Sequence, residues 1–225
     1  MKDSRTQKTH TFFFRNSLTI VFVSFFMLTL FAQPYSGWKE HNNELAQAQV
    51  AALTFGSYLT SGHFISATFE NFESEFLQMA LYVLLTIKLR QIGSSESKKL
   101  DEKEEVDRMP KNHLNAPWPV KKGGLYLKIY QNSLSIAFGL LFLMSWGLHL
   151  YGSWQHYNVE QMLDRNPKIS LSAYILEPDF WFETFQNWQS EFLSVAAIVF
   201  LSIYLRQKGS PESKPVDAPH LETGR

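Results

Sequence analysis

The chain of 225 residues contains no cysteine and has no net charge. The first absence excludes disulfide bonds, thiolate chemistry and cysteine metal sites. The second reflects 21 basic and 21 acidic side chains, and it removes the electrostatic reason to expect nucleic acid as a partner. Charged residues are also missing locally, from residues 16–38 and 129–159. Because uncharged apolar stretches of roughly 18 or more residues are typical of transmembrane helices, we expect the chain to enter a lipid bilayer.

The sequence also contains an internal repeat. Residues 16–98 align without a gap onto residues 132–214 at a constant offset, and about 31 of the 83 paired positions are identical. The segment LRQxGSxESK at residues 89–98, for example, returns at residues 205–214. The repeat predicts two copies of one structural unit, in which the shared positions were needed twice or have changed little since duplication.

Four membrane spans are expected, at about residues 16–36, 72–90, 132–152 and 188–206. The predicted fold class is therefore an all-α bundle of four transmembrane helices, made of two two-helix repeats with the same orientation. Of the 21 lysines and arginines, 18 fall on the side that holds both termini, and the three exceptions are Lys39, Arg165 and Lys168. Positive residues accumulate in cytoplasmic loops, so both termini are expected in the cytoplasm.

These spans divide the chain into segments with different expected environments. We expect a cytoplasmic N-terminus at residues 1–15, repeat 1 at 16–98 with an outer segment at 37–71, a cytoplasmic linker at 99–131, repeat 2 at 132–214 with an outer segment at 153–187, and a cytoplasmic tail at 215–225. The linker and the tail are polar, as is typical of mobile segments. The first span is interpreted as retained and not as a cleaved signal peptide, because its repeat partner lies in the middle of the chain.

Residues that favour the membrane interface flank the expected spans. The predicted interface anchors are Tyr35, Trp38, Tyr151, Trp154, Arg90 and Arg206. Gly93 and Gly209 follow the two arginines, a pattern typical of a helix that ends with a left-handed residue. We therefore interpret the LRQxGSxESK segments as helix caps with an anchoring arginine, and keep a cytoplasmic docking role as the alternative.

The second and fourth spans are short, which affects the placement of one glutamate in each. Only 14 residues separate Glu191 from Arg206, roughly 21 Å of helix, whereas the hydrocarbon layer is roughly 30 Å thick. If Arg206 marks the inner boundary, Glu191 lies below the outer one, and Glu75 is equally spaced from Arg90. An ionisable residue within a membrane is costly and is treated as a functional-site hypothesis.

Each of these glutamates belongs to a polar stripe with i, i+3, i+7 spacing, which places its members on one face of a helix. The candidate polar or ion site consists of Thr68, Asn71, Glu75, Thr184, Asn187 and Glu191. Two interpretations stay open. The stripes form a polar vestibule for protons, a cation or a small polar solute, or they supply hydrogen bonds between helices near the outer interface.

Other chemistry is not expected. His149 aligns with Gln33 in the other repeat, and Tyr157 replaces the histidine of His41-x-x-Glu44. We therefore expect neither a haem nor another metal site, and place His41 in a surface loop. The sequence shows no catalytic nucleophile–base pair or phosphate-binding loop, so no catalytic residues and no cofactor are predicted and an enzyme is not favoured.

Three segments resemble a known family: YLTSGHF at residues 58–64, FQNWQSEFLS at residues 185–194, and the chain ending from Arg206. They are similar to an uncharacterised bacterial integral-membrane family, a domain-of-unknown-function family. The resemblance runs from about Asn16 to the C-terminus and implies a multi-pass protein of the bacterial inner membrane, without an activity or ligand.

The expected function is that of a non-enzymatic structural or accessory component of the bacterial inner membrane. Its expected partners are the lipid bilayer and either a second copy of the chain or another membrane protein. The alternative is a small channel or transporter for protons, cations or a small polar solute, with the path lined by the Thr/Asn/Glu stripes.

Overall fold

The structure, a computed structural model, describes residues 11–224. Within this range every regular element is a helix and no β-strand occurs, which confirms the expected all-α class. Residues 1–10 and 225 lie outside the described residues; they include most of the expected cytoplasmic N-terminus at 1–15 and the last residue of the expected tail. The chain divides into two compact units, Met1–Phe64 and Ile65–Arg225, and each is described by itself.

The first unit contains α1 (Phe12–Arg15), α2 (Ser17–Gln47) and α3 (Phe55–Tyr58), and α4 (Gly62–Leu85) begins in it. The loop after α2 folds back onto that helix. The indole Nε1 of Trp38 donates to the carbonyl of Leu53 at 2.7 Å. The Asn42 amide donates to the same carbonyl at 3.0 Å and accepts from the Leu53 N–H at 2.7 Å. One backbone position is thereby held on two successive turns of α2.

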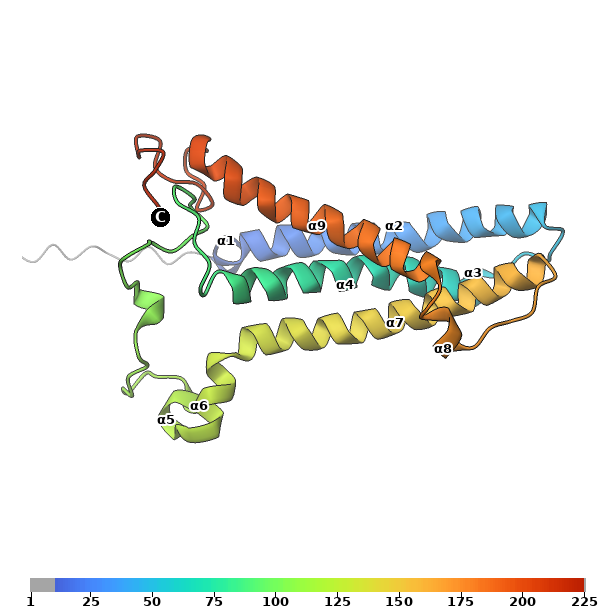
Figure 1. The fold of residues 1–225 in the computed structure, drawn as a ribbon, viewed down its shortest axis with the longest axis horizontal. Helices are drawn as coiled ribbons and strands as arrows, with labels where there is room; N and C mark the ends of the chain where they lie inside the picture. Colours follow the sequence, from blue (N-terminus) through green and yellow to red (C-terminus); the bar gives the residue numbers. More distant parts are fainter. Residues whose placement is uncertain (1–10, 225) are drawn as a thin grey trace, which may run out of the picture. The chain divides into compact units, whose positions relative to one another are not determined.

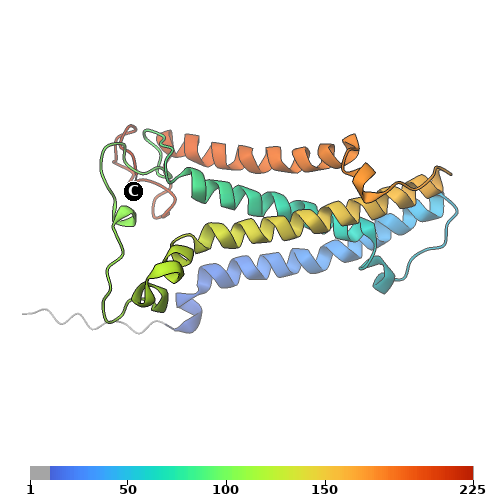
Figure 2. The same cartoon turned by 60° about the horizontal axis from the view of Figure 1, so that its bottom comes forward.

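The second unit contains most of α4 and the remaining helices: the 3₁₀ helix η1 (Glu105–Asp107), α5 (Trp118–Lys122), α6 (Gly124–Gln131), α7 (Ser133–Leu163), α8 (Leu171–Tyr174) and α9 (Pro178–Tyr204). Helices α4, α7 and α9 lie side by side in both views (Figures 1 and 2). Side chains join each pair: Ser66 meets Ser153, the Phe142 ring packs on Trp188, and Gln78 donates to Ser194. These three helices position the candidate site.

Helix boundaries recur at the repeat offset. Helix α7 begins and ends 116 residues after α2, α8 does so relative to α3, and α9 begins 116 residues after α4. The local causes recur too, since Thr54 and Ser170 both cap their short helices by accepting a backbone N–H. Trp154 and Asn158 hold Ile169 just as their counterparts hold Leu53 in the first unit. The same residues at the same spacing therefore produce the same loop.

Two helices, α2 and α7, are long and apolar enough to cross a membrane. The expected second and fourth spans lie on α4 and α9, which do not meet this measure, so length and composition do not support the four-span bundle. In α4 the reason is the acidic residues Glu70, Glu73 and Glu75. In α9 the first half contains Asp179 and Glu183, and the apolar half begins with the polar residues Asn187, Gln189 and Glu191. Helix α4 also ends at Leu85, before the expected boundary at residue 90.

The LRQxGSxESK segments form turns just beyond α4 and α9. Nη1 of Arg90 donates to the carbonyls of Thr86, Ile87 and Leu89, and Arg206 does the same at the end of α9. Both arginines therefore bind carbonyls at or just beyond the ends of their helices, whereas their expected anchoring at a membrane interface stays a prediction. The expected glycine caps are wrong, because the left-handed glycines lie well past both helix ends, with φ near 83° and 85° at Gly93 and Gly209.

The tail after Lys214, which the sequence predicts to be mobile, packs on the first of these segments. The Gly93 N–H donates to the Thr223 hydroxyl at 2.8 Å, and the Gly224 N–H donates to the Ser94 carbonyl at 3.0 Å. The expectation of a loose tail is wrong because its backbone carbonyls find a buried donor in the Lys214 ammonium.

Candidate functional site

A histidine on α7 lies at the centre of a buried charged cluster. His149 has no solvent exposure, and its ring stands 5.2 Å from the Phe180 ring of α9, centroid to centroid. Its Nδ1 faces Oε2 of Glu73 at 3.1 Å, an ion-pair contact without hydrogen-bond angles. Its Nε2 lies 3.4 Å from Oε2 of Glu183 and 3.8 Å from Oε2 of Glu70. Both ring nitrogens therefore face carboxylates.

Helix geometry explains how these groups meet. Glu70 and Glu73 are three residues apart on α4, so their side chains project from one face of that helix. His149 projects from α7 and Glu183 from the first half of α9. Because the three helices lie side by side, two glutamates from α4 and one from α9 surround the imidazole.

Hydrogen bonds hold two of the carboxylates in place. The indole Nε1 of Trp188 donates to Oε1 of Glu73 at 3.3 Å. The Ser153 hydroxyl donates to Oε2 of Glu183 at 2.9 Å, and it meets the Ser66 hydroxyl at 2.5 Å. Ser153 has a single hydrogen, so the Ser66 hydroxyl supplies the one between the two serines. The cluster is thus a network across three helices, not a set of isolated charges.

The predicted polar stripes lie elsewhere, with partial overlap. Asn71 and Glu75 are exposed, whereas Thr68 and Thr184 are buried. Glu75 and Glu191 are close enough to interact electrostatically. The structure therefore brings the two glutamates near one another on α4 and α9, outside the histidine cluster.

One stripe residue does reach the cluster. Asn71 and Asn187 each donate to the carbonyl four residues earlier on their own helix, Ala67 and Glu183. In addition, the Asn187 side chain interacts electrostatically with Glu70. The stripe on α9 is therefore linked to the charged cluster, whereas Asn71 is exposed on α4.

The aromatic anchors have structural tasks of their own. Trp38 and Trp154 are half-buried and hold the loops after α2 and α7, while Tyr35 and Tyr151 are exposed and contact the rings of these tryptophans. Their position at a membrane interface stays a prediction, as does that of the two capping arginines.

Sequence reasoning missed the cluster because it required symmetry. None of its members is repeated; the aligned residues in the other half are Gln186, Gln189, Gln33 and Ala67, for Glu70, Glu73, His149 and Glu183 in turn. The sequence did contain a signal: the acidic pair Glu70 and Glu73, spaced i, i+3 on one expected helix, and His149 on a second expected helix that is otherwise uncharged.

A smaller cluster lies in the first unit. His41 is buried on α2, so its predicted place in a surface loop is wrong. Its Nδ1 lies 3.2 Å from Oε2 of Glu44, and its ring stacks on His63 with centroids 4.7 Å apart. Nδ1 of His63 meets the Tyr58 hydroxyl at 3.1 Å. Burial raises the pKa of Tyr58 to about 12, and burial beside His41 lowers the pKa of His63.

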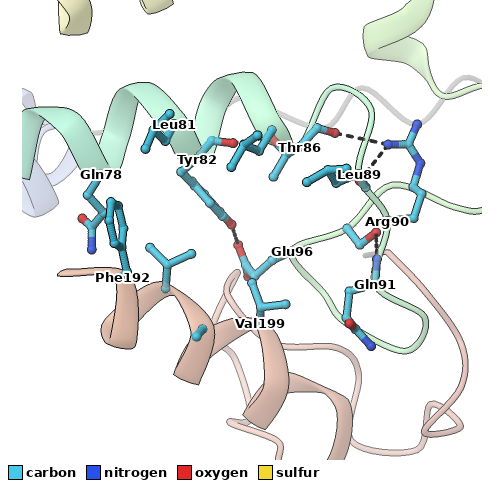
Figure 3. A pocket seen from close by; sticks show the side chains of 14 residues that line it. Gln78, Leu81, Tyr82, Thr86, Leu89, Arg90, Gln91, Glu96, Phe192 and Val199 are labelled. Carbon is cyan, nitrogen blue, oxygen red and sulfur yellow. Dashed lines mark hydrogen bonds between the residues drawn. The ribbon is translucent and has the colours of Figure 1, made fainter. Parts of the chain in front are cut away.

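A cavity of about 290 Å³ lies between α4, α9 and the segment that follows α4 (Figure 3). Leu81, Phe192 and Val199 are among its apolar lining residues. The Tyr82 hydroxyl donates to the Glu96 carboxylate beside it, which pairs the two polar groups at that edge. Neither glutamate of the polar stripes lines this cavity, whose walls suit an apolar group and not an ion.

Fold and composition define an all-α protein with two helices able to cross a membrane. Residues 9–225 match the family described as Domain of unknown function (DUF6766), and the chain belongs to this family. No curated protein and no solved structure matches the chain.

Proposed function

We propose that this chain is a multi-pass protein of the bacterial inner membrane, with four spans and cytoplasmic termini, that acts as a structural or accessory component. One observation carries the membrane assignment: the apolar windows of α2 and α7 are only 6% and 17% buried. A soluble core helix would hide such a face. An exposed apolar surface of this length requires lipid or a protein partner.

The accessory role rests on the outer segments. Each is tied to the preceding helix by a tryptophan and an asparagine that bind one backbone position. Such ties reduce the entropy lost when a partner binds, because the loop is already ordered. The proposed partners are a second copy of the chain or another membrane protein.

The linker distinguishes four spans from two. With four spans, residues 99–112 lie in the cytoplasm with both termini. If only α2 and α7 cross, the linker lies on the opposite side from the N-terminus. A reporter protein active on only one side of the membrane, inserted within residues 99–112, is expected to read cytoplasmic, and the same reporter after residue 166 to read periplasmic. A periplasmic linker would refute the four-span arrangement.

A second candidate function is transport of protons or cations, and the electrostatic repulsion between the Glu75 and Glu191 carboxylates, which a bound proton or cation relieves, favours it. Gln78 lies beside this pair and donates to the carbonyl of Glu191 and the hydroxyl of Ser194. Flux into liposomes that contain the purified protein should fall in the variant with Glu75→Gln and Glu191→Gln. Absence of flux in the wild type would end this proposal for the ions tested.

A further inference from the structure

The charged cluster around His149 carries more negative charge than its own residues can balance. It contains three carboxylates and one imidazole, so the ionised cluster has a net charge of about −2 even with a protonated histidine. Across the described residues, the ion pairs of these carboxylates are with His149 and not with lysine or arginine. Burying uncompensated charge is costly, so the cluster needs a further cation or bound protons.

The geometry points to a metal cation: we propose that His149, Glu70 and Glu183 bind a divalent transition metal of the Mn²⁺, Fe²⁺ or Zn²⁺ class. The proposal goes beyond the membrane role, and departs from the expectation that the chain holds no metal. One imidazole nitrogen and two carboxylate oxygens form the set. Imidazole favours transition metals, whereas Ca²⁺ and Mg²⁺ prefer oxygen alone.

The ligand atoms are spaced for such an ion. Nε2 of His149 and one carboxylate oxygen from each of Glu70 and Glu183 all lie within 4.8 Å of one another. The 3.4 Å between Nε2 and Oε2 of Glu183 matches the roughly 3.3 Å edge of a tetrahedron with metal–ligand bonds of about 2.0 Å. Oε2 of Glu70, 3.8 Å from Nε2, needs a shift of only a few tenths of an ångström.

The surroundings resemble the outer shell of a metal site. A metal-binding histidine usually presents its second nitrogen to a carboxylate, which orients the ring and makes it a better ligand. Glu73 faces Nδ1 of His149 in this way, and the Trp188 indole holds Glu73. The Ser153 hydroxyl likewise orients Glu183. Glu73 therefore orients His149, and Ser153 orients Glu183, before a metal arrives.

Two buried hydroxyls provide a separate indication. Ser145 lies one turn before His149 on the same face of α7, and Thr184 follows Glu183. Both are wholly buried, and in the described part of the chain neither hydroxyl has a hydrogen-bond partner. Buried polar atoms are normally satisfied. Because Ser145 shares a face of α7 with His149, water bound to a metal there would supply the partner that its hydroxyl lacks.

An ion can reach the cluster from outside. The side chains of Glu70 and Glu183 are 24% and 38% exposed, whereas His149 and Glu73 are fully buried. The two carboxylates therefore offer an entry from the surface toward the buried nitrogen. Their partial exposure also lets them adjust around an incoming ion.

The test is Zn²⁺ binding to the purified full-length chain in detergent, after treatment with a chelator. Calorimetry and metal analysis should find a tight site that an excess of Mg²⁺ or Ca²⁺ does not displace. We expect Glu183→Gln and His149→Gln to lose it, and Glu73→Gln to weaken it about 10- to 100-fold. Asp179→Asn, an exposed carboxylate on the same helix but outside the cluster, is the matched control and should bind as the wild type does.

A second variant distinguishes Zn²⁺ binding at the His149 cluster from binding at the histidine cluster of the first unit. His41, Glu44 and His63 also bring three ligand atoms together, so all titrations are repeated in a His41→Gln background. X-ray absorption of the Zn²⁺-loaded His41→Gln protein should show one imidazole per metal with oxygen ligands. This readout does not depend on whether the His149→Gln variant folds.

Three results would overturn the proposal. One is no tight Zn²⁺ in the His41→Gln protein, which would mean that protons balance the cluster. Another is tight Zn²⁺ binding that persists in the Glu183→Gln variant and also in the His149→Gln variant. The third is a Zn²⁺ spectrum without imidazole.

Discussion

Lys214 and Lys98 occupy equivalent positions in the two LRQxGSxESK segments but have different surroundings. Lys214 is buried, with 2% of its surface exposed. Its Nζ donates to the carbonyls of Pro219, His220 and Glu222 at 3.1, 2.8 and 2.8 Å. Nζ of Lys98 instead pairs with a carboxylate oxygen of Asp107 at 2.5 Å, near the surface. The repeat thus provides a natural matched pair of lysines.

The substitution Lys214→Met keeps a long stem and removes all three donors. An unsatisfied buried carbonyl costs about 1–3 kcal/mol, but carbonyls of a surface segment regain water as the tail loosens. The substitution also removes the free-energy cost of burying the ammonium group, which offsets a further part of the lost stability. We therefore expect the tail to lose about 3 kcal/mol of local stability. Lys98→Met removes one surface ion pair, and the tail should keep its stability.

Hydrogen exchange measures this difference directly. The Gly224 and Ala218 amides are bonded to the carbonyls of Ser94 and Pro215. Their protection should fall about 100-fold in Lys214→Met, because each 1.4 kcal/mol is a factor of ten. It should not change in Lys98→Met. Equal protection of the tail in the two variants would refute the idea that the buried ammonium holds it.

Three further predictions concern other parts of the chain. Asn158→Ala removes both bonds to Ile169 and should increase hydrogen exchange in the loop after α7 without changing the helix content seen by circular dichroism. Gly93→Ala should destabilise the protein more than Gly209→Ala in thermal unfolding: both glycines have positive φ, but only at Gly93 would the new Cβ come within 2.5 Å of a carbonyl oxygen. Equal losses would contradict this. The lowered pKa of His63 means that the unfolded chain binds a proton more readily, so stability is complete above about pH 6.5 and is lost as the pH falls below it. His63→Gln should flatten this slope in unfolding measured between pH 7.5 and 5.

Much of the local structure follows from short stretches of sequence. The same apolar run forms a helix in both repeats, as α2 and α7 show with equal lengths of 31 residues. The arginine caps of Arg90 and Arg206 depend on carbonyls within four residues. Such contacts are predictable because the chain neighbours themselves are the partners.

Helices α4 and α9, which carry the expected second and fourth spans, show what composition alone does not predict. An apolar half predicts each helix, and both helices form, yet their first halves also contain acidic residues. Glu73 is wholly buried, whereas Glu75 two residues later is exposed. Only the packing of α4 against α7 and α9 decides which of these two carboxylates is hidden.

The duplication is visible in the sequence. It determines the helices and loops of both copies, because contacts between residues close in the chain form them. It carries no information on residues that only one copy has. His149, Glu70 and Glu183 come from three helices, and the distances between them depend on how those helices pack. Symmetry in the sequence therefore specifies the scaffold, and tertiary packing alone creates the asymmetric charged cluster, because electrostatic contact depends on separation in space and not along the chain.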